Sequence, residues 1–139
     1  MNALGNTADS KVLAWINSTD QTMHWADPLN GETDQCAENV EPDKPPVGEC
    51  SEHYSGPIPA VAHLHGGEVP PVLDGGPDAW FTSDGKHHGH AYYTRTGLAG
   101  NEAIYRYPNV QEDAPIWFHD HTLGLTRLSV YAGLAGDYL

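Results

Sequence analysis

The sequence is poor in basic residues, and this shortage disfavours negatively charged binding partners. Lys and Arg together number 6 against 19 Asp and Glu, which gives a formal net charge of −13 at pH 7. A surface of that sign repels phosphate backbones and anionic lipids, so we expect no nucleic acid and no membrane among its partners. The same charge attracts cations, metal ions included.

Long apolar runs are lacking as well. The longest wholly apolar stretch is Val12–Ile16, whereas a membrane-spanning helix needs about 20 apolar residues. The first twenty residues contain neither a basic start nor an apolar segment long enough for the core of a signal peptide, so no signal peptide is expected. The compartment stays unknown, because Met1 need not be the natural start of the protein.

Cysteine is scarce, with only Cys36 and Cys50. Their spacing does not fit a C-x-x-C redox or zinc motif. If oxidised, they would close a loop of about 15 residues, worth about 3 kcal/mol in the chain-entropy model. A disulfide and two unpaired thiols in a surface loop both remain open, because the redox compartment is unknown.

Glycine and proline are abundant, with 15 and 11 among 139 residues. They favour many turns and short strands, and the length suits one domain with a modest core. The segment 19–59 is acidic, proline-containing and without apolar alternation, which predicts a long loop. A short helix is predicted within 122–136. Strands are predicted, from alternation and tyrosine content, at Lys11–Asn17, Ala60–Gly66, 90–95, 103–108, 115–121 and 136–139.

Two His-x-His pairs stand on predicted strands, in "VAHLHGG" and "PIWFHDH". Alternation places His63 and His65 on one face of their strand. It likewise places Trp117, His119 and His121 together. Asp120 faces away from these histidines, so it is a candidate for supporting the ligands or for a structural role, and not for a ligand itself. Neutral imidazole is a preferred ligand of copper, zinc and iron. One pair alone is a weak signal, but two pairs on separate strands favour a metal site, and the lack of thiolates disfavours a structural zinc knuckle.

Other polar residues and the tryptophans are weaker candidates. The "KHHGH" run holds His87, His88 and His90 in a glycine-bounded stretch, which favours a solvated loop over a second metal site. Asp74 before two glycines is also what a plain turn requires. Trp80 and Trp117 are expected in the core.

Four stretches together resemble the first domain of the three-domain multicopper oxidases, within the laccase-like branch that includes bacterial spore-coat laccases and bilirubin oxidases. They are "HLHGG", "LDGGPDAWF", "YRYPN" and "WFHDHTLGLTRLSVYAGLAGDYL". The resemblance implies an all-β, cupredoxin-like Greek-key β-sandwich that is incomplete. Residues 1–139 would form a single partial domain, with a long loop at 19–59 and the copper-ligand region at 60–139.

The resemblance also implies a ligand set. In this family four His-x-His pairs hold a trinuclear copper cluster. His63 would bind the type-2 copper and His65 one type-3 copper, while His119 and His121 would bind the type-3 pair, one each. Asp74 matches an acidic position beside the type-2 copper, where it would orient bound water and help to supply protons.

The chain lacks other parts of the family pattern. The His-Cys-His signature of the type-1 copper and two of the four His-x-His pairs are missing, and no histidine flanks Cys36 or Cys50. We therefore expect an internal piece of a larger oxidase, which takes electrons from phenols, aromatic amines, bilirubin or metal ions and reduces dioxygen to water. The piece alone should show little turnover, and its open edges predict self-association.

Three other hypotheses stay open at this stage. The strongest is a stand-alone copper-binding module without oxidase activity. A homodimer that brings four His-x-His pairs together ranks lower. A binuclear zinc hydrolase ranks lowest, because such sites usually add bridging carboxylates, whereas glycines and Glu68 follow His65.

Overall fold

The structure is a computed structural model that describes residues 25–28 and 57–139. The strand predicted at Lys11–Asn17, both cysteines and most of the loop predicted at 19–59 lie outside the described residues.

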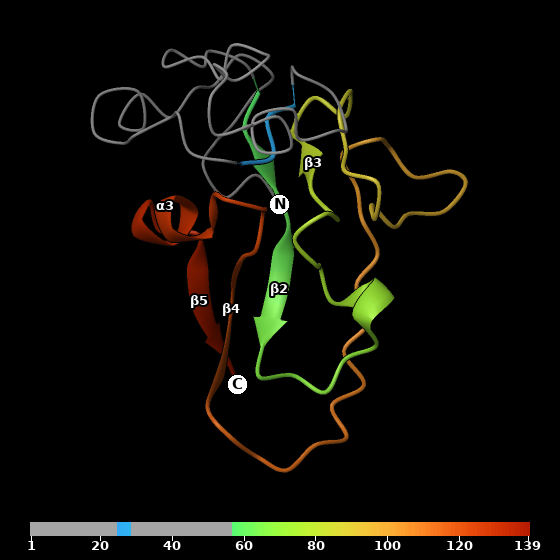
Figure 1. Cartoon of the computed structure of the whole chain (residues 1–139). Coiled ribbons are helices and arrows are strands. Elements are labelled where there is room, and N and C mark those ends of the chain that lie inside the picture. Colours follow the sequence, from blue (N-terminus) through green and yellow to red (C-terminus); the bar gives the residue numbers. More distant parts are fainter. Residues whose placement is uncertain (1–24, 29–56) are drawn as a thin grey trace, which may run out of the picture.

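Two small antiparallel sheets form the framework of the described part of the chain (Figure 1). The first pairs two short strands, β1 (Pro59–Ala60) and β3 (Phe81–Thr82). The second has three strands in the order β2-β4-β5, namely β2 (Ala62–His65), β4 (Ile116–Asp120) and β5 (Ala135–Tyr138). The all-β class is thus confirmed, and the described part is consistent with an incomplete cupredoxin-like fold.

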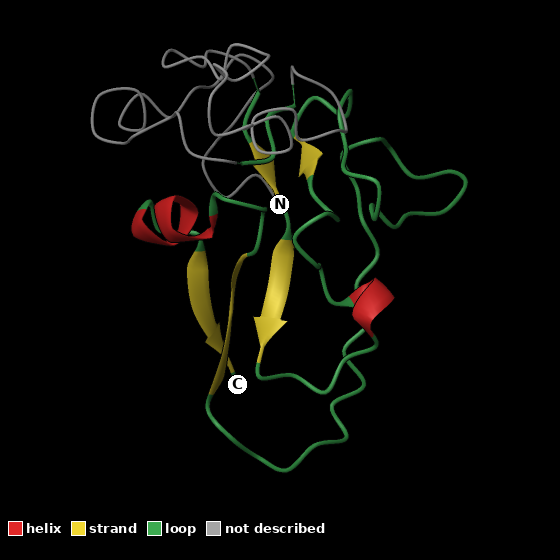
Figure 2. Cartoon of the chain, viewed as in Figure 1, coloured by secondary structure: helices red, strands yellow, loops and turns green. Residues whose placement is uncertain are grey.

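Within residues 25–28 and 57–139, two short helices accompany the sheets (Figure 2). A 3-10 helix, η1, spans Pro71–Leu73, and the α-helix α3 spans Thr126–Tyr131 between β4 and β5. The helix predicted within 122–136 and the strand predicted at its end are both confirmed. Among the described residues no helix has the length and apolar character to cross a membrane.

The strand predicted at Ala60–Gly66 is divided in two at Val61, which is a correction. Before Val61 the chain pairs with β3, and after it the chain pairs with β4. At the switch, the Val61 amide donates to the Asp120 side chain at 2.8 Å, and the Val61 carbonyl accepts from the His121 amide at 3.0 Å. A side chain thus replaces a ladder partner where the strand changes sheets.

Among the residues that the structure describes, buried apolar side chains form two clusters. Trp25, Ile58 and Leu125 form one, and Ala26, Val61 and Trp80 form the other. The prediction of Trp80 as a core residue is confirmed. Residues 25–28 of the 19–59 region are buried, and the Ala26 amide donates to the Leu123 carbonyl at 2.9 Å. This segment therefore covers the end of the sheet that carries the second histidine pair.

The strands predicted at 90–95 and 103–108 are absent, which is a second correction. One backbone hydrogen bond joins these segments, from the Ile104 amide to the Tyr93 carbonyl. Tyrosine favours strands because its side chain packs well on a pleated sheet surface, so the preference has an effect only where the segment can pair with a sheet. Here the tyrosine hydroxyls bond to backbone instead: Tyr92 donates to two loop carbonyls, and Tyr105 accepts from the Ala62 amide.

Candidate metal centre

Strand register brings the two histidine pairs together. In the antiparallel pairing of β2 with β4, His63 lies directly opposite His119, and His65 lies opposite Trp117. His121 follows β4, and its amide continues the pairing by donating to the Val61 carbonyl. Because alternate residues of a strand share a face, all four histidines lie on the same side of the sheet.

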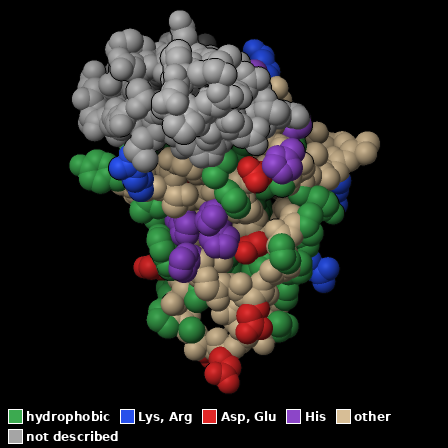
Figure 3. Space-filling model, viewed as in Figure 1, with side chains coloured by type: hydrophobic (Ala, Val, Ile, Leu, Met, Phe, Trp, Pro, Cys, Tyr) green, Lys and Arg blue, Asp and Glu red, His purple; other side chains and the backbone are tan. Residues whose placement is uncertain are grey.

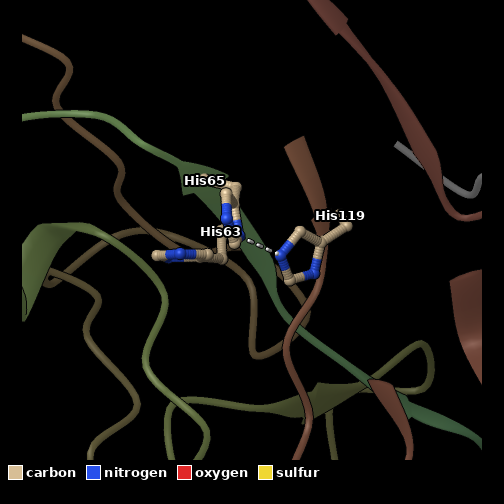
Figure 4. A group of neighbouring side chains, drawn as sticks. All are labelled: His63, His65 and His119. Carbon is tan, nitrogen blue, oxygen red and sulfur yellow. Dashed lines mark hydrogen bonds between the residues drawn. The ribbon is translucent and has the colours of Figure 1, made fainter. Parts of the chain in front are cut away.

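The imidazole rings form one compact group. The ring centroid of His63 lies 5.3 Å from that of His119 and 4.6 Å from that of His121. His119 and His121 stack at 5.6 Å. Ligand nitrogens of three of these residues lie within 4.8 Å of one another, those of His63, His65 and His119 (Figure 4). In Figure 3 histidine side chains gather in a patch next to an acidic side chain.

Two of the rings are oriented by backbone carbonyls. The Nδ1–H of His63 donates to the Asp74 carbonyl at 3.1 Å, and that of His119 donates to the Asp120 carbonyl at 2.6 Å. A carbonyl can only accept, so both rings carry their proton on Nδ1. Each Nε2 therefore carries a lone pair to which a metal ion could bind, as in many protein metal sites.

His65 presents its Nδ1 to His119. The distance from His65 Nδ1 to His119 Nε2 is 3.1 Å (Figure 4). Two imidazole nitrogens that bind one ion at about 2.0–2.1 Å, roughly at right angles, would be about 3 Å apart. The pair therefore fits a shared ion, which would replace the proton between the two nitrogens.

Asp74 reaches this group through a tight turn. It ends η1, and the following Gly75 has φ +73°. A Cβ on Gly75 would lie 1.8 Å from the Ala62 carbonyl oxygen, so only glycine lets the turn lie this close to β2. The Oδ1 atom of Asp74 consequently lies 3.3 Å from His63 Nδ1, yet it accepts no hydrogen bond there.

Burial keeps His121 in the ligand form. Desolvation lowers the pKa of His121, and the neighbouring rings of His63 and His119 lower this pKa further. A lowered pKa favours the neutral imidazole, which is the form that binds metals. The Nδ1 atom of His121 is buried without a hydrogen-bond partner. An orphan nitrogen here and an orphan oxygen on Asp74 fit a site completed by an ion and its bound water.

The structure corrects the expectation for Trp117 and confirms that for Asp120. Trp117 is 37% exposed and belongs to neither apolar cluster; its ring lies against those of His65 and His119. The alternation of 115–121 already put Trp117 on the histidine face, and only its apolar character suggested the core. Asp120 is 3% exposed and accepts from the Val61 amide and the Thr122 hydroxyl, which is a structural role.

The "KHHGH" histidines remain apart from this group. His88 and His90 are exposed, His88 stacks on Tyr92, and His90 lies 3.8 Å from Asp78. Within 25–28 and 57–139, none of them joins a cluster of three ligand residues. The expectation of a solvated loop is therefore confirmed for these two residues.

Comparison with known proteins gives the chain its relatives. It is 44% identical over 89 residues to a laccase from Bacillus subtilis (strain 168), which covers 64% of this chain and 16% of that protein. It is 38% identical over 101 residues to "Multicopper oxidase LPR1" from Arabidopsis thaliana, covering 73% and 16% of the two chains. A rice protein, "Multicopper oxidase LPR1 homolog 5" (Oryza sativa subsp. japonica), is 46% identical over 84 residues, covering 60% and 12%.

Over about 60% or more of its length, the chain is thus homologous to part of proteins named laccase and multicopper oxidase. The resemblance to multicopper oxidases, drawn from the four stretches quoted above, is thereby confirmed. No family model matches the chain. The aligned part spans only 12–16% of the length of these three multicopper oxidases, so a much larger share of each relative has no counterpart here.

Proposed function

We propose that this chain supplies half of the histidine ligands of a trinuclear copper cluster in a laccase-like multicopper oxidase. The observation that carries the proposal is the meeting of the two His-x-His pairs across β2 and β4, with His65 Nδ1 and His119 Nε2 only 3.1 Å apart. An all-imidazole donor set suits copper and zinc alike. The choice of copper over zinc is supported by the relatives, which are named laccase and multicopper oxidase.

The rings divide into roles according to their contacts. His65 and His119 would share one type-3 copper, because their nitrogens already face each other. His121, stacked on His119, would bind the other type-3 copper. His63 would bind the type-2 copper, with its Nδ1 proton held by the Asp74 carbonyl and its Nε2 free. The two His-x-His pairs missing from this sequence would complete the cluster.

Asp74 would serve proton delivery at the same site. When bound, the copper cluster supplies the electron-transfer chemistry by which dioxygen is reduced to two waters, a reaction that consumes four protons. The Oδ1 atom of Asp74 is buried, accepts no hydrogen bond and lies 3.3 Å from His63 Nδ1. It can therefore accept a proton from bound water or donate one to it without first breaking another contact. Phenols and related one-electron donors would be the reductants of the whole oxidase.

The test is copper per chain, measured by elemental analysis after copper loading and exhaustive dialysis. The wild-type chain is compared with the double variant His63→Ala/His119→Ala. The matched control is His88→Ala/His90→Ala, which removes two exposed histidines from the "KHHGH" loop. We expect the wild type and the control to retain copper and the site variant to lose it. Equal copper in all three would contradict the proposed ligands.

A second arm tests the metal preference of the chain and its oxidase activity on its own. Loading with an equimolar mixture of both metals should leave copper in excess, as the order of affinities for nitrogen sites predicts. Oxygen uptake with a phenolic donor should be negligible for the chain alone. Sustained oxygen uptake by the chain alone would overturn the assignment of substrate oxidation to other parts of the oxidase.

A further inference from the structure

We propose that Trp117 is a positioning residue whose indole fixes the imidazole plane of His65, and with it that of His119, for a metal ion shared by both. The inference rests on the proposed function, since it concerns the same ion. Its starting point is an aromatic side chain that the core does not use: Trp117 is 37% exposed and lies in neither apolar cluster.

The indole lies against both rings. The centroid of Trp117 is 5.1 Å from that of His65 and 4.5 Å from that of His119, each at an interplanar angle of 37°. Register explains the contacts, because Trp117 is the cross-strand partner of His65 and lies two residues before His119 on the same face.

His65 depends on this contact more than the other ligands do. His63 and His119 are each anchored through Nδ1 by a backbone carbonyl. The Nδ1 atom of His65 instead faces His119 Nε2, and His65 is the exposed last residue of β2. When an ion replaces that hydrogen bond, the indole still restrains the His65 ring plane, and its centroid, at 5.1 Å, is nearer to that ring than the centroids of His119 and His63, at 5.3 and 6.0 Å. A ring held in the binding orientation loses less conformational freedom when the ion binds.

The indole also favours the bound state electrostatically. An imidazole that coordinates a cation is more positive than a free neutral imidazole. The face of an indole attracts positive charge, and it does so more strongly than the faces of phenyl and phenol rings. Trp117 therefore stabilises the metal-bound site more than the empty one, which is the property required of a positioning residue.

The neighbouring residue provides a matched control. Phe118 lies on the same strand with a similar exposure, 41%, and points to the opposite face, where it meets Gly136. Replacing it perturbs β4 without touching the histidines. The variants are therefore Trp117→Leu, Trp117→Phe and Phe118→Leu in the full 139-residue chain. If the Leu variant at 117 does not fold, Trp117→Thr takes its place, because threonine suits an exposed strand position.

The experiment measures Cu²⁺ affinity against a competing chelator, together with the electron paramagnetic resonance spectrum at one Cu²⁺ per chain. We expect Trp117→Leu to weaken Cu²⁺ binding by about tenfold or more, as for other groups that orient metal ligands, and to alter the copper hyperfine splitting. Trp117→Phe should restore most of the affinity. Phe118→Leu should stay within about twofold of the wild type, as substitutions away from a site usually do.

The outcomes separate the two proposals. Wild-type affinity and an unchanged spectrum in Trp117→Leu would overturn the positioning role and leave the ligand assignment intact. An equal loss in Phe118→Leu would also overturn it, because the effect would then belong to the strand. If the wild type retains no more copper than His63→Ala/His119→Ala, the proposed function fails, and the inference about Trp117 fails with it.

Discussion

At the scale of single residues, Gly75 decides whether Asp74 meets His63. Its φ is positive, and a Cβ at this position would lie 1.8 Å from the Ala62 carbonyl oxygen, so both features forbid a side chain. We expect Gly75→Ala to lower the free energy of unfolding by about 2 kcal/mol or more, from backbone strain and the clash with β2. Urea unfolding measures this loss. Gly76→Ala is the control, because a Cβ there would meet nothing within 4 Å, and an equal loss in both variants would contradict the argument.

His121 makes a residue-scale prediction about pH. Burial and the rings of His63 and His119 lower its pKa from the ordinary value of 6.5. Below 6.5 the unfolded chain therefore binds this proton before the folded chain does, so stability from His121 is complete above 6.5 and falls as the pH drops towards its folded pKa. A proton NMR titration of the ring should give a midpoint below 6.5. A midpoint at or above 6.5 would mean that the ring is not buried as described.

At the scale of elements, Asp120 joins the two sheets. Its carboxylate accepts from the Val61 amide, where the chain passes from β1 to β2, and from the Thr122 hydroxyl after β4. We expect Asp120→Ala to cost about 2 kcal/mol or more, because a buried amide loses its acceptor. Asp120→Asn keeps a carbonyl oxygen and should cost about 1 kcal/mol. Amide exchange at Val61, compared with unfolding midpoints, checks the mechanism: unchanged Val61 protection in the Ala variant would contradict it.

The elements that could be predicted from the sequence are those that depend on a pattern of neighbouring residues. β4 and the second histidine pair follow from strict alternation, and α3 follows from apolar residues at helical spacing. The division of the first histidine strand at Val61 depends on Asp120, 59 residues away, and no local pattern contains it. The strands predicted at 90–95 and 103–108 were wrong for the same reason, because the contacts of these segments are not local in sequence. Their tyrosine hydroxyls form hydrogen bonds with backbone groups, and the segments do not pair with a sheet edge.

The candidate site was more predictable than the strands that surround it. Period-two alternation fixes which face His63, His65, His119 and His121 occupy, so their meeting needed only that β2 and β4 pair in register. The approach of Asp74 also needed the turn at Gly75, for which the run of two glycines was the visible signal. The place of Trp117 on the histidine face was visible in the alternation as well, but its apolar character favoured the core. A large aromatic residue near metal ligands can either pack in the core or lie against the ligand rings.

At the scale of the whole molecule, metal binding should be linked to folding. The chain carries a net charge of −13, and its histidine group joins residues from β2, β4 and the turn after η1. An ion held by these elements binds only the folded chain with full affinity. Free Cu²⁺ at 100 times its Kd should therefore add about 2.7 kcal/mol to the free energy of unfolding. Thermal unfolding with Cu²⁺, and again after a chelator is added, measures this gain.

The variants tell this linkage apart from the general attraction of a cation to an acidic chain. His63→Ala/His119→Ala keeps the net charge of −13, because neutral histidines are not counted in it, but loses the ligands. Its unfolding temperature should not rise with Cu²⁺. Magnesium is the second control, because it satisfies the charge but prefers oxygen ligands, and it should not stabilise the wild type at the same concentration. A rise of equal size in the variant, or with magnesium, would mean that charge neutralisation stabilises the chain and that the four histidines do not act as one site.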